Sequence, residues 1–374
     1  TAALLWHKHP ELGSLWVDIA TARTEFYPYP AANPEVEASS IKQDLYRRDF
    51  TINALALRLN PGNMNNNDIY EHQLLDFFGG LNDIENRIIR VLHPNSFIED
   101  PTRIYRAVRF AVRLNFTIES QTEGYIKYAI ASGIYHKIKL KKERAPALET
   151  RLKNELKYIL TANYWSKALQ LLGELGALTC IHSSLELNQE LWWQIRFMSK
   201  FLQKIKRNVK ISLNFPDWQI ILELLIAHLK PEYRVKVAEN LQFSGESISR
   251  LQGLENGENM LKEKFALCQY PSEIIKILKG YDLESLILIG ARSTKVMRKI
   301  IWKYLTYWLQ IKPPLNGHDL KIMGYKQGPN FKIILESLLL AIIDEKIGNT
   351  KEDAIAFIKQ NFPVGWVEGS ETQH

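Results

Sequence analysis

Two arginines and an aspartate stand side by side in residues 44–54, the segment with the densest set of chemically useful side chains. Arg47 and Arg48 precede Asp49, and Asn53 follows four residues later. We expect a helix to begin here, and arginines at a helix N-terminus suit a triphosphate because the backbone N–H groups also favour anions. A carboxylate can accept a ribose hydroxyl. The segment therefore predicts a nucleotide site, with capping of the helix as the alternative role for Asp49.

A second cluster, residues 99–113, places an acidic pair ahead of four arginines at helical spacing. Its members are Glu99, Asp100, Arg103, Arg106, Arg109 and Arg113. At about 100° per residue, the arginines fall within about a third of the helix circumference. We expect Asp100 to cap the helix, and apolar residues such as Ile104 and Val108 to face the core. A stripe of arginines is often only a solvated face, but the acidic pair beside it favours a binding site.

Between the two clusters lies a segment with paired glycines. It contains Asp76, Gly79, Gly80 and Asp83. Glycine permits a sharp turn from a strand into a helix. Two interpretations stay open, a hinge and a plain turn.

The elements that must position these side chains divide into a short mixed segment and a long helical one. Alternating apolar residues predict a strand over 15–20, with Asp18 on the face opposite its apolar neighbours. The pattern predicts a helix over 49–56, and two strands, 55–60 and 69–77, about an Asn-rich loop.

Beyond Pro101 the pattern is mainly helical, most clearly at 152–160, 218–229, 295–309 and 331–343. We therefore expect an α+β fold in which a small α/β piece precedes an extended all-helical part.

Composition excludes several classes of protein. In 374 residues, 46% are apolar and 24% charged, which is ordinary for a globular protein and argues against wholesale disorder. No apolar run approaches the length of a membrane span, so we expect no membrane partner. Two cysteines form neither a disulfide framework nor a zinc site alone, which favours a reducing cytoplasm. The net charge of +7 is a weak indication of a polyanionic partner.

In this order, the three clusters resemble the tRNA nucleotidyltransferase and poly(A) polymerase family, that is, the class II CCA-adding enzymes and their A-adding relatives. The Arg-Arg-Asp nucleotide motif of the family matches Arg47, Arg48 and Asp49, and its flexible Asp-x-x-Gly-Gly-x-x-Asp element matches Asp76, Gly79, Gly80 and Asp83. Its Glu-Asp-x-x-Arg-x-x-Arg base-recognition motif matches Glu99, Asp100, Arg103 and Arg106. A later helix motif is matched loosely, by Arg151, Glu155 and Leu156 or by Glu143-Arg144.

The resemblance implies a partial nucleotidyltransferase head (1–90), a helical neck with the base-recognition motif (91–160), an RNA-binding helical body (161–310) and a helical tail (311–374). It implies template-independent transfer of AMP to the 3′ end of tRNA, with transfer of CMP left open. The implied partners are tRNA, ATP and, as an open alternative, CTP, and the implied cofactor is Mg²⁺. A poly(A) polymerase and a non-catalytic RNA-binding remnant are the alternatives.

One motif of the family is missing. No Asp-x-Asp occurs in the sequence, and neither does the preceding Gly-Gly-x-x-Arg-Asp. In the family these carboxylates hold two Mg²⁺ ions, so we expect them N-terminal to Thr1 and expect the chain as given to be inactive. Asp18, flanked by Val17 and Ile19, fits the position of a third carboxylate and is a candidate catalytic residue and metal ligand. A strand aspartate facing solvent is the alternative.

Other residues add to the expected site. Arg23, Glu25 and Tyr27 follow Asp18 on the same segment and are predicted to line the cleft. In the helical part, two basic stretches, 137–144 and 200–210, could neutralise RNA phosphates. Trp192, Trp193 and Phe197 lie near the second, either as core residues or as stacking platforms for bases.

The residue types also predict which bases are accepted. Adenine and cytosine share an edge in which an exocyclic amine donates beside a ring nitrogen that accepts, whereas uracil and guanine present the reverse. A carboxylate only accepts and a guanidinium only donates. Asp100 and Arg103, three residues apart on one helix, can therefore face one base together and favour ATP and CTP. Arg106 and Arg109, farther along that face, are predicted to brace the pocket or meet phosphates.

Overall fold

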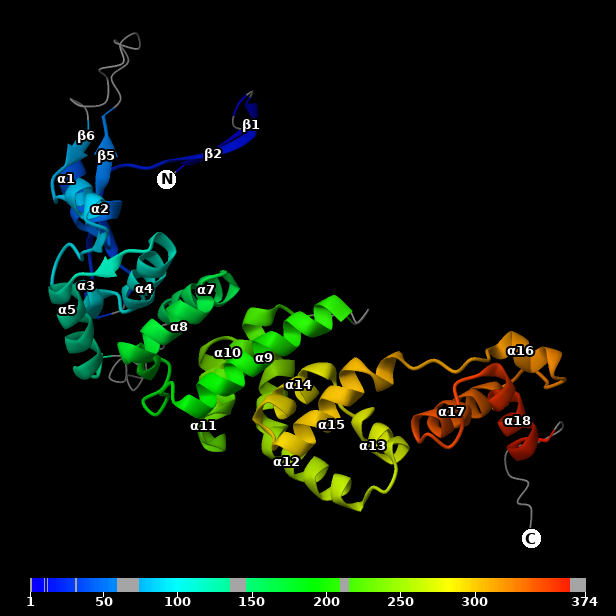
Figure 1. The fold of residues 1–374 in the computed structure, drawn as a ribbon. Helices are drawn as coiled ribbons and strands as arrows, with labels where there is room; N and C mark the ends of the chain where they lie inside the picture. Colours follow the sequence, from blue (N-terminus) through cyan, green and yellow to red (C-terminus); the bar gives the residue numbers. More distant parts are fainter. Residues whose placement is uncertain are drawn as a thin grey trace. The chain divides into compact units, whose positions relative to one another are not determined.

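The structure is a computed structural model that describes residues 2–9, 11, 13–30, 32–58, 74–134, 146–208 and 215–363. Its contacts divide the chain into two compact units, drawn in Figure 1. The first contains Thr1–Asn188 and Val235–Ser244, and the second contains Gln189–Arg234 and Gly245–His374. The boundaries expected near residues 90, 160 and 310 stay predictions.

In the described residues, the strands of the first unit pair two by two. Antiparallel pairs are β1 (Ala2–His9) with β2 (Gly13–Ile19), β3 (Arg23–Phe26) with β4 (Glu35–Ala38), and β5 (Leu55–Leu57) with β6 (Leu74–Asp76); β7 (Ile88–Ile89) is parallel to β8 (Thr117–Ile118). The strand expected over 15–20 is confirmed by β2 and the strand pair about a loop by β5 and β6. Residues 59–73, which include the Asn-rich loop, lie outside the described residues.

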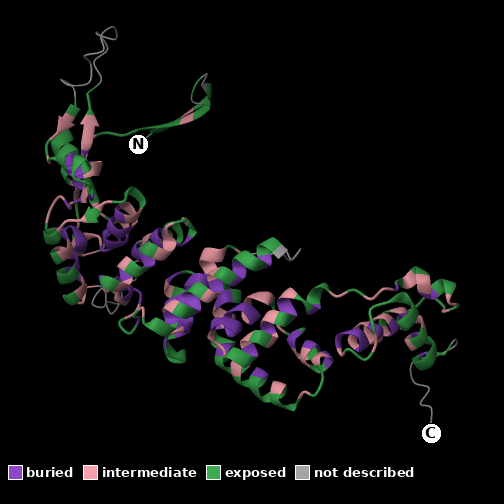
Figure 2. Cartoon of the chain, in the orientation of Figure 1, coloured by how far each residue is buried: buried purple, intermediate pink, exposed green. Residues whose placement is uncertain are grey.

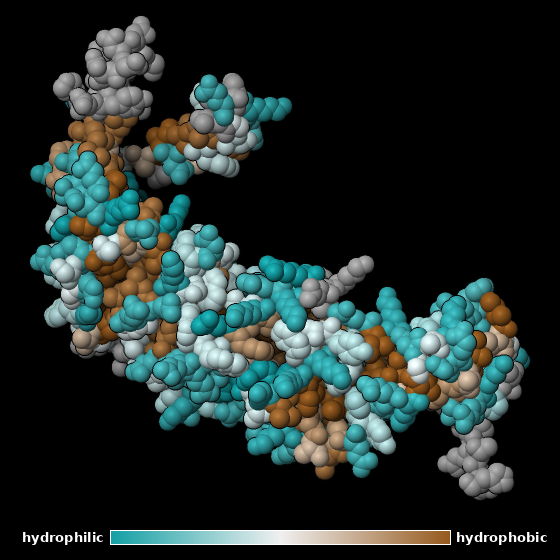
Figure 3. Space-filling model, in the orientation of Figure 1, coloured by the Kyte–Doolittle hydropathy of each residue, from teal (hydrophilic) through white to brown (hydrophobic). Residues whose placement is uncertain are grey.

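The hairpin of β1 and β2 has an exposed apolar surface (Figure 3). Leu4, Trp6, Trp16 and Ile19 are each more than half exposed. The alternation over 15–20 thus predicted the strand correctly, but its apolar side chains are not buried in the structure.

The helices of the first unit surround one core. They are α1 (Ile41–Tyr46), α2 (Gly80–Glu85), α3 (Ser96–Glu99), α4 (Thr102–Leu114), α5 (Ser120–Ala131), α7 (Pro146–Thr161) and α8 (Trp165–Glu174), with 3-10 turns η1 (Thr51–Asn53) and η3 (Ala177–Cys180). Ile104 and Val108 of α4 are fully buried, as expected. Tyr105 of the same helix donates a 2.7 Å hydrogen bond to the Ala177 carbonyl, which ties α4 to η3.

The helix expected over 49–56 is wrong. Phe50 is extended, with φ −132° and ψ 154°, and only the short turn η1 follows before β5. The reason is a pairing with a distant segment: Phe50 forms a β-bridge with Val91, and the Thr51 N–H donates to the Arg90 carbonyl at 3.0 Å. This tertiary pairing outweighs the local helical pattern, and Arg47 lies at the end of α1 rather than at a helix start.

The second unit is helical throughout its described residues. Its elements are α9 (Gln189–Asn208), α10 (Asp217–Ala227), α12 (Gly245–Leu267), α13 (Pro271–Leu278), α14 (Leu283–Arg292), α15 (Lys295–Thr306), η4 (Trp308–Gln310), α16 (Gly317–Ile322), α17 (Asn330–Ile343) and α18 (Lys351–Asn361), while α11 (Pro231–Asn240) is divided between the units. Buried residues concentrate in α10 and α14 (Figure 2), and α16 to α18 pack around Leu320, Leu338 and Ile358.

The four clearest predicted helices are confirmed by α7, α10, α15 with η4, and α17, and so is the expected fold class. In the described part of the chain, no helix combines the length and the apolar character needed to cross a bilayer.

Candidate active site

A pocket of about 670 Å³ in the first unit joins the two arginine clusters. It is lined by Glu25, Tyr27, Arg47, Arg48, Asp49, Asn53, Asp100, Thr102, Arg103, Arg106, Phe110, Arg151, Asn154, Glu155 and Tyr158. Segments about 50 residues apart in the sequence therefore supply one site. The lining is rich in both guanidinium and carboxylate groups, which suits a ligand that has phosphates and hydrogen-bonding edges.

Two carboxylates hold the paired arginines on one side of the pocket. Buried Asp44 accepts from Arg47 Nη2 at 2.9 Å and from Arg48 Nη2 at 3.4 Å, and Glu25 accepts from Arg47 Nη1. Burial alone raises the pKa of Asp44, but hydrogen bonds from the Arg23 N–H and Arg47 outweigh it and lower the pKa. The Arg48 side chain is 46% exposed and makes the looser contact, so its guanidinium is the more available to a ligand.

Asp49 connects this side to α4. It is buried, and its Oδ2 accepts from Arg106 Nε at 2.7 Å and Nη2 at 2.5 Å, while Oδ1 accepts from Asn53 Nδ2 at 2.9 Å. On the other side Glu155 of α7 accepts from Arg109 Nε at 2.8 Å and contacts Arg106 Nη1 at 3.4 Å. Arg106 and Arg109 are therefore held by carboxylates and do not form a solvated face; the roles expected of them, bracing the pocket or meeting phosphates, stay predictions.

Asp100 and Arg103 stand at the start of α4. The Asp100 Oδ1 accepts from the Thr102 N–H at 3.0 Å and from its Oγ1 at 2.6 Å. The N-cap of α4 is Pro101, so the N-cap position expected for Asp100 is wrong by one residue, and Asp100 binds the first helical residue from just outside the helix. Arg103 is buried, with 6% of its surface exposed. It donates to Ser96 Oγ at 2.5 Å and to the Arg47 carbonyl at 3.0 Å.

A partly buried histidine, His93, lies beside this pair. Burial, with a smaller effect from the charge of Arg103, lowers the pKa of His93 to about 4. Burial also raises the pKa of Glu99, whose Oε2 lies 3.5 Å from His93 Nε2. Because His93 is neutral at physiological pH, we treat this contact as a weak polar one and not as an ion pair.

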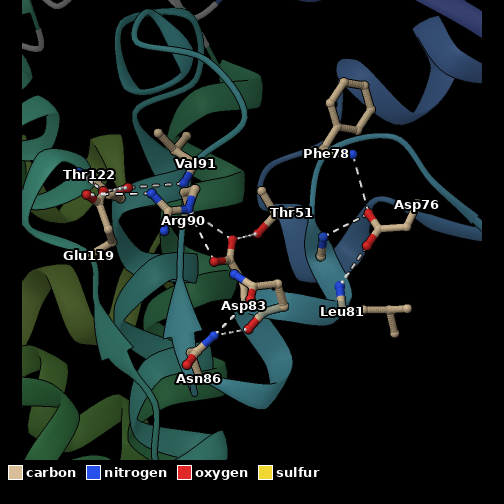
Figure 4. Close-up of polar contacts among 12 residues, drawn as sticks. Thr51, Asp76, Phe78, Leu81, Asp83, Asn86, Arg90, Val91, Glu119 and Thr122 are labelled. Carbon is tan, nitrogen blue, oxygen red and sulfur yellow. Dashed lines mark hydrogen bonds and ion pairs between the residues drawn. The ribbon is translucent and has the colours of Figure 1, made fainter.

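The paired-glycine segment forms a tightly hydrogen-bonded turn outside the pocket lining (Figure 4). Asp76 accepts from the N–H groups of Gly80 at 2.8 Å and Leu81 at 2.9 Å, and Gly79 has a φ of +76°. Buried Asp83 accepts from Thr51 Oγ1 at 2.6 Å and from Arg90 Nε at 3.0 Å. The geometry is that of a capped strand-to-helix turn, and hinge motion stays a prediction.

Asp18 lies apart from these residues. It is exposed on β2, opposite Ala3 of β1, and does not line the pocket. Among the described residues, no three His, Cys, Asp or Glu side chains are grouped so that they could hold a metal ion. The described residues therefore do not fit the Mg²⁺ site that the family resemblance implies, and Asp18 as a metal ligand stays a prediction.

A second basic region lies in the second unit, where α9 packs beside α15. Six of its exposed cations, here called the α9–α15 face, are Arg196, Lys200, Lys204, Arg207, Lys295 and Lys299. Lys204 Nζ lies 4.8 Å from the Trp302 ring, and Arg298 lies 4.2 Å from the ring of Trp193. No acidic side chain of the described residues lies within 4.0 Å of the face's six cations.

On α9, Trp193 was expected either as a core residue or as a stacking platform for bases. Trp193 is 47% exposed, and its ring stacks on Phe197 with centroids 5.4 Å apart. It is neither a core residue nor an open platform, since Arg298 covers part of it. The other basic stretch, 137–144, and Lys210 lie outside the described residues.

Sequence reasoning missed part of the pocket wall. Arg23, Glu25 and Tyr27 were expected to line the cleft; Glu25 and Tyr27 line the pocket, and Arg23 does not. Asn154 and Tyr158 were not expected. Their signal was available, because Arg151, Asn154, Glu155 and Tyr158 recur at helical spacing on one face of α7.

Known proteins are similar to this chain in sequence and in architecture. Residues 1–90 match the family model described as the poly(A) polymerase head domain. The chain is 32% identical over 356 residues to an A-adding tRNA nucleotidyltransferase of Geobacter sulfurreducens, covering 91% of this chain and 37% of the relative. It is 29% identical over 381 residues to the A-adding tRNA nucleotidyltransferase of Halalkalibacterium halodurans, covering 95% of this chain and 78% of the relative.

Among solved structures, the Thermotoga maritima CCA-adding enzyme complexed with tRNA-CCA superimposes with a TM-score of 0.64 and 25% identity. The match covers 86% of this chain and 74% of that enzyme. The chain spans little more than a third of the length of the Geobacter relative.

Proposed function

We propose, from its similarity to the A-adding and CCA-adding tRNA nucleotidyltransferases and from the match of residues 1–90 to the poly(A) polymerase head domain, that the chain acts in the transfer of AMP from ATP to the 3′ end of tRNA. The proposal does not include transfer of CMP from CTP, which the addition assay described below tests. The observation that supports it most is the convergence of Arg47, Arg48 and Asp49 with Asp100, Arg103 and Arg106 on one pocket.

In this proposal, different pocket residues bind different parts of the nucleotide. Arg48, half-exposed and loosely paired, binds the triphosphate, and Arg47 supports it from a fixed position. Asp100 recognises the base edge at the start of α4, while Arg106 and Arg109 brace the wall behind it. The ion pairs within the protein hold these side chains in place before the nucleotide binds, so little side-chain conformational entropy is lost on binding.

The chemistry of the transfer needs groups beyond the described residues. Two Mg²⁺ ions would align the 3′-hydroxyl with the α-phosphate in this family, but the described residues offer no carboxylate cluster and the sequence has no Asp-x-Asp. We therefore propose that residues 1–374 alone add no nucleotide. Mg²⁺-dependent addition by this chain alone would contradict that part of the proposal.

The α9–α15 face supports tRNA as the partner. Helices α9 and α15 contain nine Lys and Arg and one acidic residue, a formal charge of +8 in a chain whose net charge is +7. The remaining residues therefore sum to −1, so the excess positive charge lies on two adjacent helices. Unpaired lysines and arginines neutralise phosphates without recognising sequence.

A salt titration tests the RNA part of the proposal. We expect replacement of Arg196, Lys200, Lys295 and Lys299 by Gln, here called the face variant, to reduce the slope of log K for tRNA against log salt by about three. The matched control replaces Lys127, Lys236, Lys279 and Lys346, exposed lysines that each pair with an acid, and should keep the slope. An unchanged slope in the face variant would contradict tRNA binding at this face.

An addition assay tests the activity. The family's Gly-Gly-x-x-Arg-Asp and Asp-x-Asp segment is joined ahead of Thr1, and tRNAs ending before the first C, the second C or the A receive CTP or ATP separately. Addition of A only to tRNA ending in CC indicates an A-adding enzyme, and addition at all three ends indicates a CCA-adding one. Repeated addition of A indicates a poly(A) polymerase, and no addition at all supports a non-catalytic RNA-binding remnant. We also propose a cytoplasmic location, because Cys180 and Cys268 are both free.

A further inference from the structure

The pocket of the first unit follows two neighbouring helices, α4 and α7. At one end, Arg151 Nε of α7 lies 3.7 Å from Asp100 Oδ2, and neither Nε nor Nη2 of Arg151 has a hydrogen-bond partner among the described residues. Further along, Glu155 accepts from Arg109 Nε at 2.8 Å, and the Arg109 guanidinium lies 5.5 Å from the ring centroid of Tyr158. Residue numbers rise in the same direction on both helices, so the pocket has one end at Asp100 and the other at Tyr158.

Tyr158 lies too far along α7 to cover a base held at the Asp100 end. Arg151 and Tyr158 are about two helical turns apart, which separates their Cα atoms by about 10 Å at about 1.5 Å per residue. In the proposed function, the base of the incoming nucleotide occupies the Asp100 end. The Tyr158 end is therefore open to a second group.

The Tyr158 ring has the features of a stacking platform. Tyr158 lines the pocket and is 59% exposed, whereas its neighbours Leu156 and Ile159 are fully buried and anchor the helix beneath it. Arg109 lies over one face of the ring and is itself held by buried Glu155, so the ring is supported from one side, and its exposure leaves the other face open. Such a ring can stack on any base, because every base has a π-face.

Building on the proposed function, we propose that Tyr158 stacks on the unpaired base at the 3′ end of the tRNA and so positions that end beside the incoming nucleotide. The bases of a single-stranded RNA end are free to stack on aromatic side chains. Asn154, exposed one turn earlier in the same lining, offers a donor and an acceptor to the base edge or the ribose. The Tyr158 ring is uncharged and makes no phosphate contact, so the α9–α15 face remains the source of salt-dependent RNA binding.

A reporter base tests this assignment without requiring catalysis. The probe is a tRNA ending in CC in which 2-aminopurine replaces the last base, because the fluorescence of 2-aminopurine decreases when it stacks. The full chain at saturating concentration is compared with Tyr158→Ala and with Tyr158→Phe, which keeps the ring. Tyr128→Ala is the matched control, since Tyr128 is a 69% exposed tyrosine of α5 outside the pocket lining. Thermal unfolding identifies any variant that fails to fold.

We expect the unmodified chain, Tyr158→Phe and Tyr128→Ala to decrease the fluorescence equally, and Tyr158→Ala to lose most of the decrease. Loss of one base–aromatic contact lowers the equilibrium constant for stacking roughly fivefold to a hundredfold. The affinity of Tyr158→Ala for tRNA should fall by no more than that factor, and the slope of log K against log salt should not change, because no phosphate contact is lost. An equal decrease in Tyr158→Ala and the unmodified chain would overturn the assignment, and so would loss of the decrease in Tyr158→Phe.

The same proteins separate this inference from the proposed function when the dissociation constant of ATP is also measured by calorimetry. If Tyr158→Ala weakens ATP and keeps the fluorescence decrease, the ring stacks on the incoming nucleotide; the assignment is then wrong and the proposed function stands. If the unmodified chain binds ATP and tRNA without a fluorescence decrease, the assignment is again wrong and the proposed function stands. If the unmodified chain binds neither ATP nor tRNA, the proposed function fails and the assignment fails with it.

Discussion

The pocket of the first unit and the α9–α15 face of the second use positive charge in opposite ways. Arg47 and Arg106 of the pocket lining, and Arg109 outside the lining, are each held by one or two carboxylates at hydrogen-bond distance. On the α9–α15 face, six exposed cations lie beyond ion-pair distance of every acidic side chain that the structure describes. One region fixes its guanidinium groups with carboxylates, and the other leaves its cations exposed and without an ion-pair partner among the described residues.

This difference determines how selective each region is for its ligand. A fixed arginine presents its donors at one position, so a ligand must match that geometry, and selectivity follows. A free lysine adapts to any phosphate within reach, so it contributes affinity without selectivity and is strongly weakened by salt. We therefore assign choice of nucleotide to the pocket and binding of RNA to the α9–α15 face.

Removing one carboxylate from the pocket should give the largest loss of stability. Asp49→Ala leaves Arg106 with only the longer contact to Glu155 and removes the acceptor for Asn53, so we expect the free energy of unfolding to fall by about 2–4 kcal/mol. Urea denaturation measures it. Lys200→Ala on the α9–α15 face should change the same quantity by no more than about 0.5 kcal/mol. Equal losses of unfolding free energy in Asp49→Ala and Lys200→Ala would contradict the difference described between the pocket and the α9–α15 face.

The paired-glycine turn should also tolerate little change. A Cβ at Gly80 would lie 2.4 Å from the Thr51 carbonyl oxygen, so Gly80→Ala must displace backbone and should cost about 1–3 kcal/mol. Gly124→Ala is the control, since no atom lies within 4 Å of a Cβ there and alanine favours the helix α5 by about 0.5–1 kcal/mol. If Gly80→Ala proves as stable as the unmodified chain, η1 and α2 are less rigidly packed than we describe.

Low pH should lower the free energy of unfolding through protonation of His93. Its pKa is about 4 in the folded chain against 6.5 as the ordinary value, so between these pH values the unfolded chain binds more protons. Stability is therefore fully present above pH 6.5 and is lost as the pH falls toward 4, by about 1–2 kcal/mol at pH 5. The raised pKa of Glu99 acts in the opposite direction, so the comparison is made between variants.

His93→Gln isolates this histidine. The loss of unfolding free energy between pH 7.5 and pH 5 should be smaller in His93→Gln than in the unmodified chain. The α9–α15 face as defined consists of lysines and arginines and contains no histidine, so His93→Gln does not alter its charges. An identical pH dependence in both proteins would mean that His93 is not the titrating group.

Much of the pocket could be predicted from the sequence because its parts form dense local clusters. Arg47 to Asn53 and Asp100 to Arg106 each place several useful side chains within one or two helical turns. Local periodicity also predicted which face of α4 is buried, because apolar and charged residues alternate there with the helical period.

What the sequence could not provide is which charges pair across the fold. Asp49 and Arg106 are 57 residues apart, and nothing local indicates that this carboxylate holds that arginine. The same long-range pairing explains the wrong helix over 49–56, since the hydrogen bond to Arg90 depends on a segment about 40 residues away. Arg151 matched a family motif only loosely, and its unused donors are visible only in three dimensions.

The central claim is that nucleotide selection and RNA binding are separate properties of two regions, and a crossed binding experiment tests it most directly. The dissociation constants of ATP and of tRNA are measured for the unmodified chain, for Asp100→Ala and for the face variant. We predict that Asp100→Ala weakens ATP about tenfold or more and leaves tRNA unchanged, while the face variant weakens tRNA and leaves ATP unchanged. Loss of both ligands in parallel in either folded variant would contradict the account.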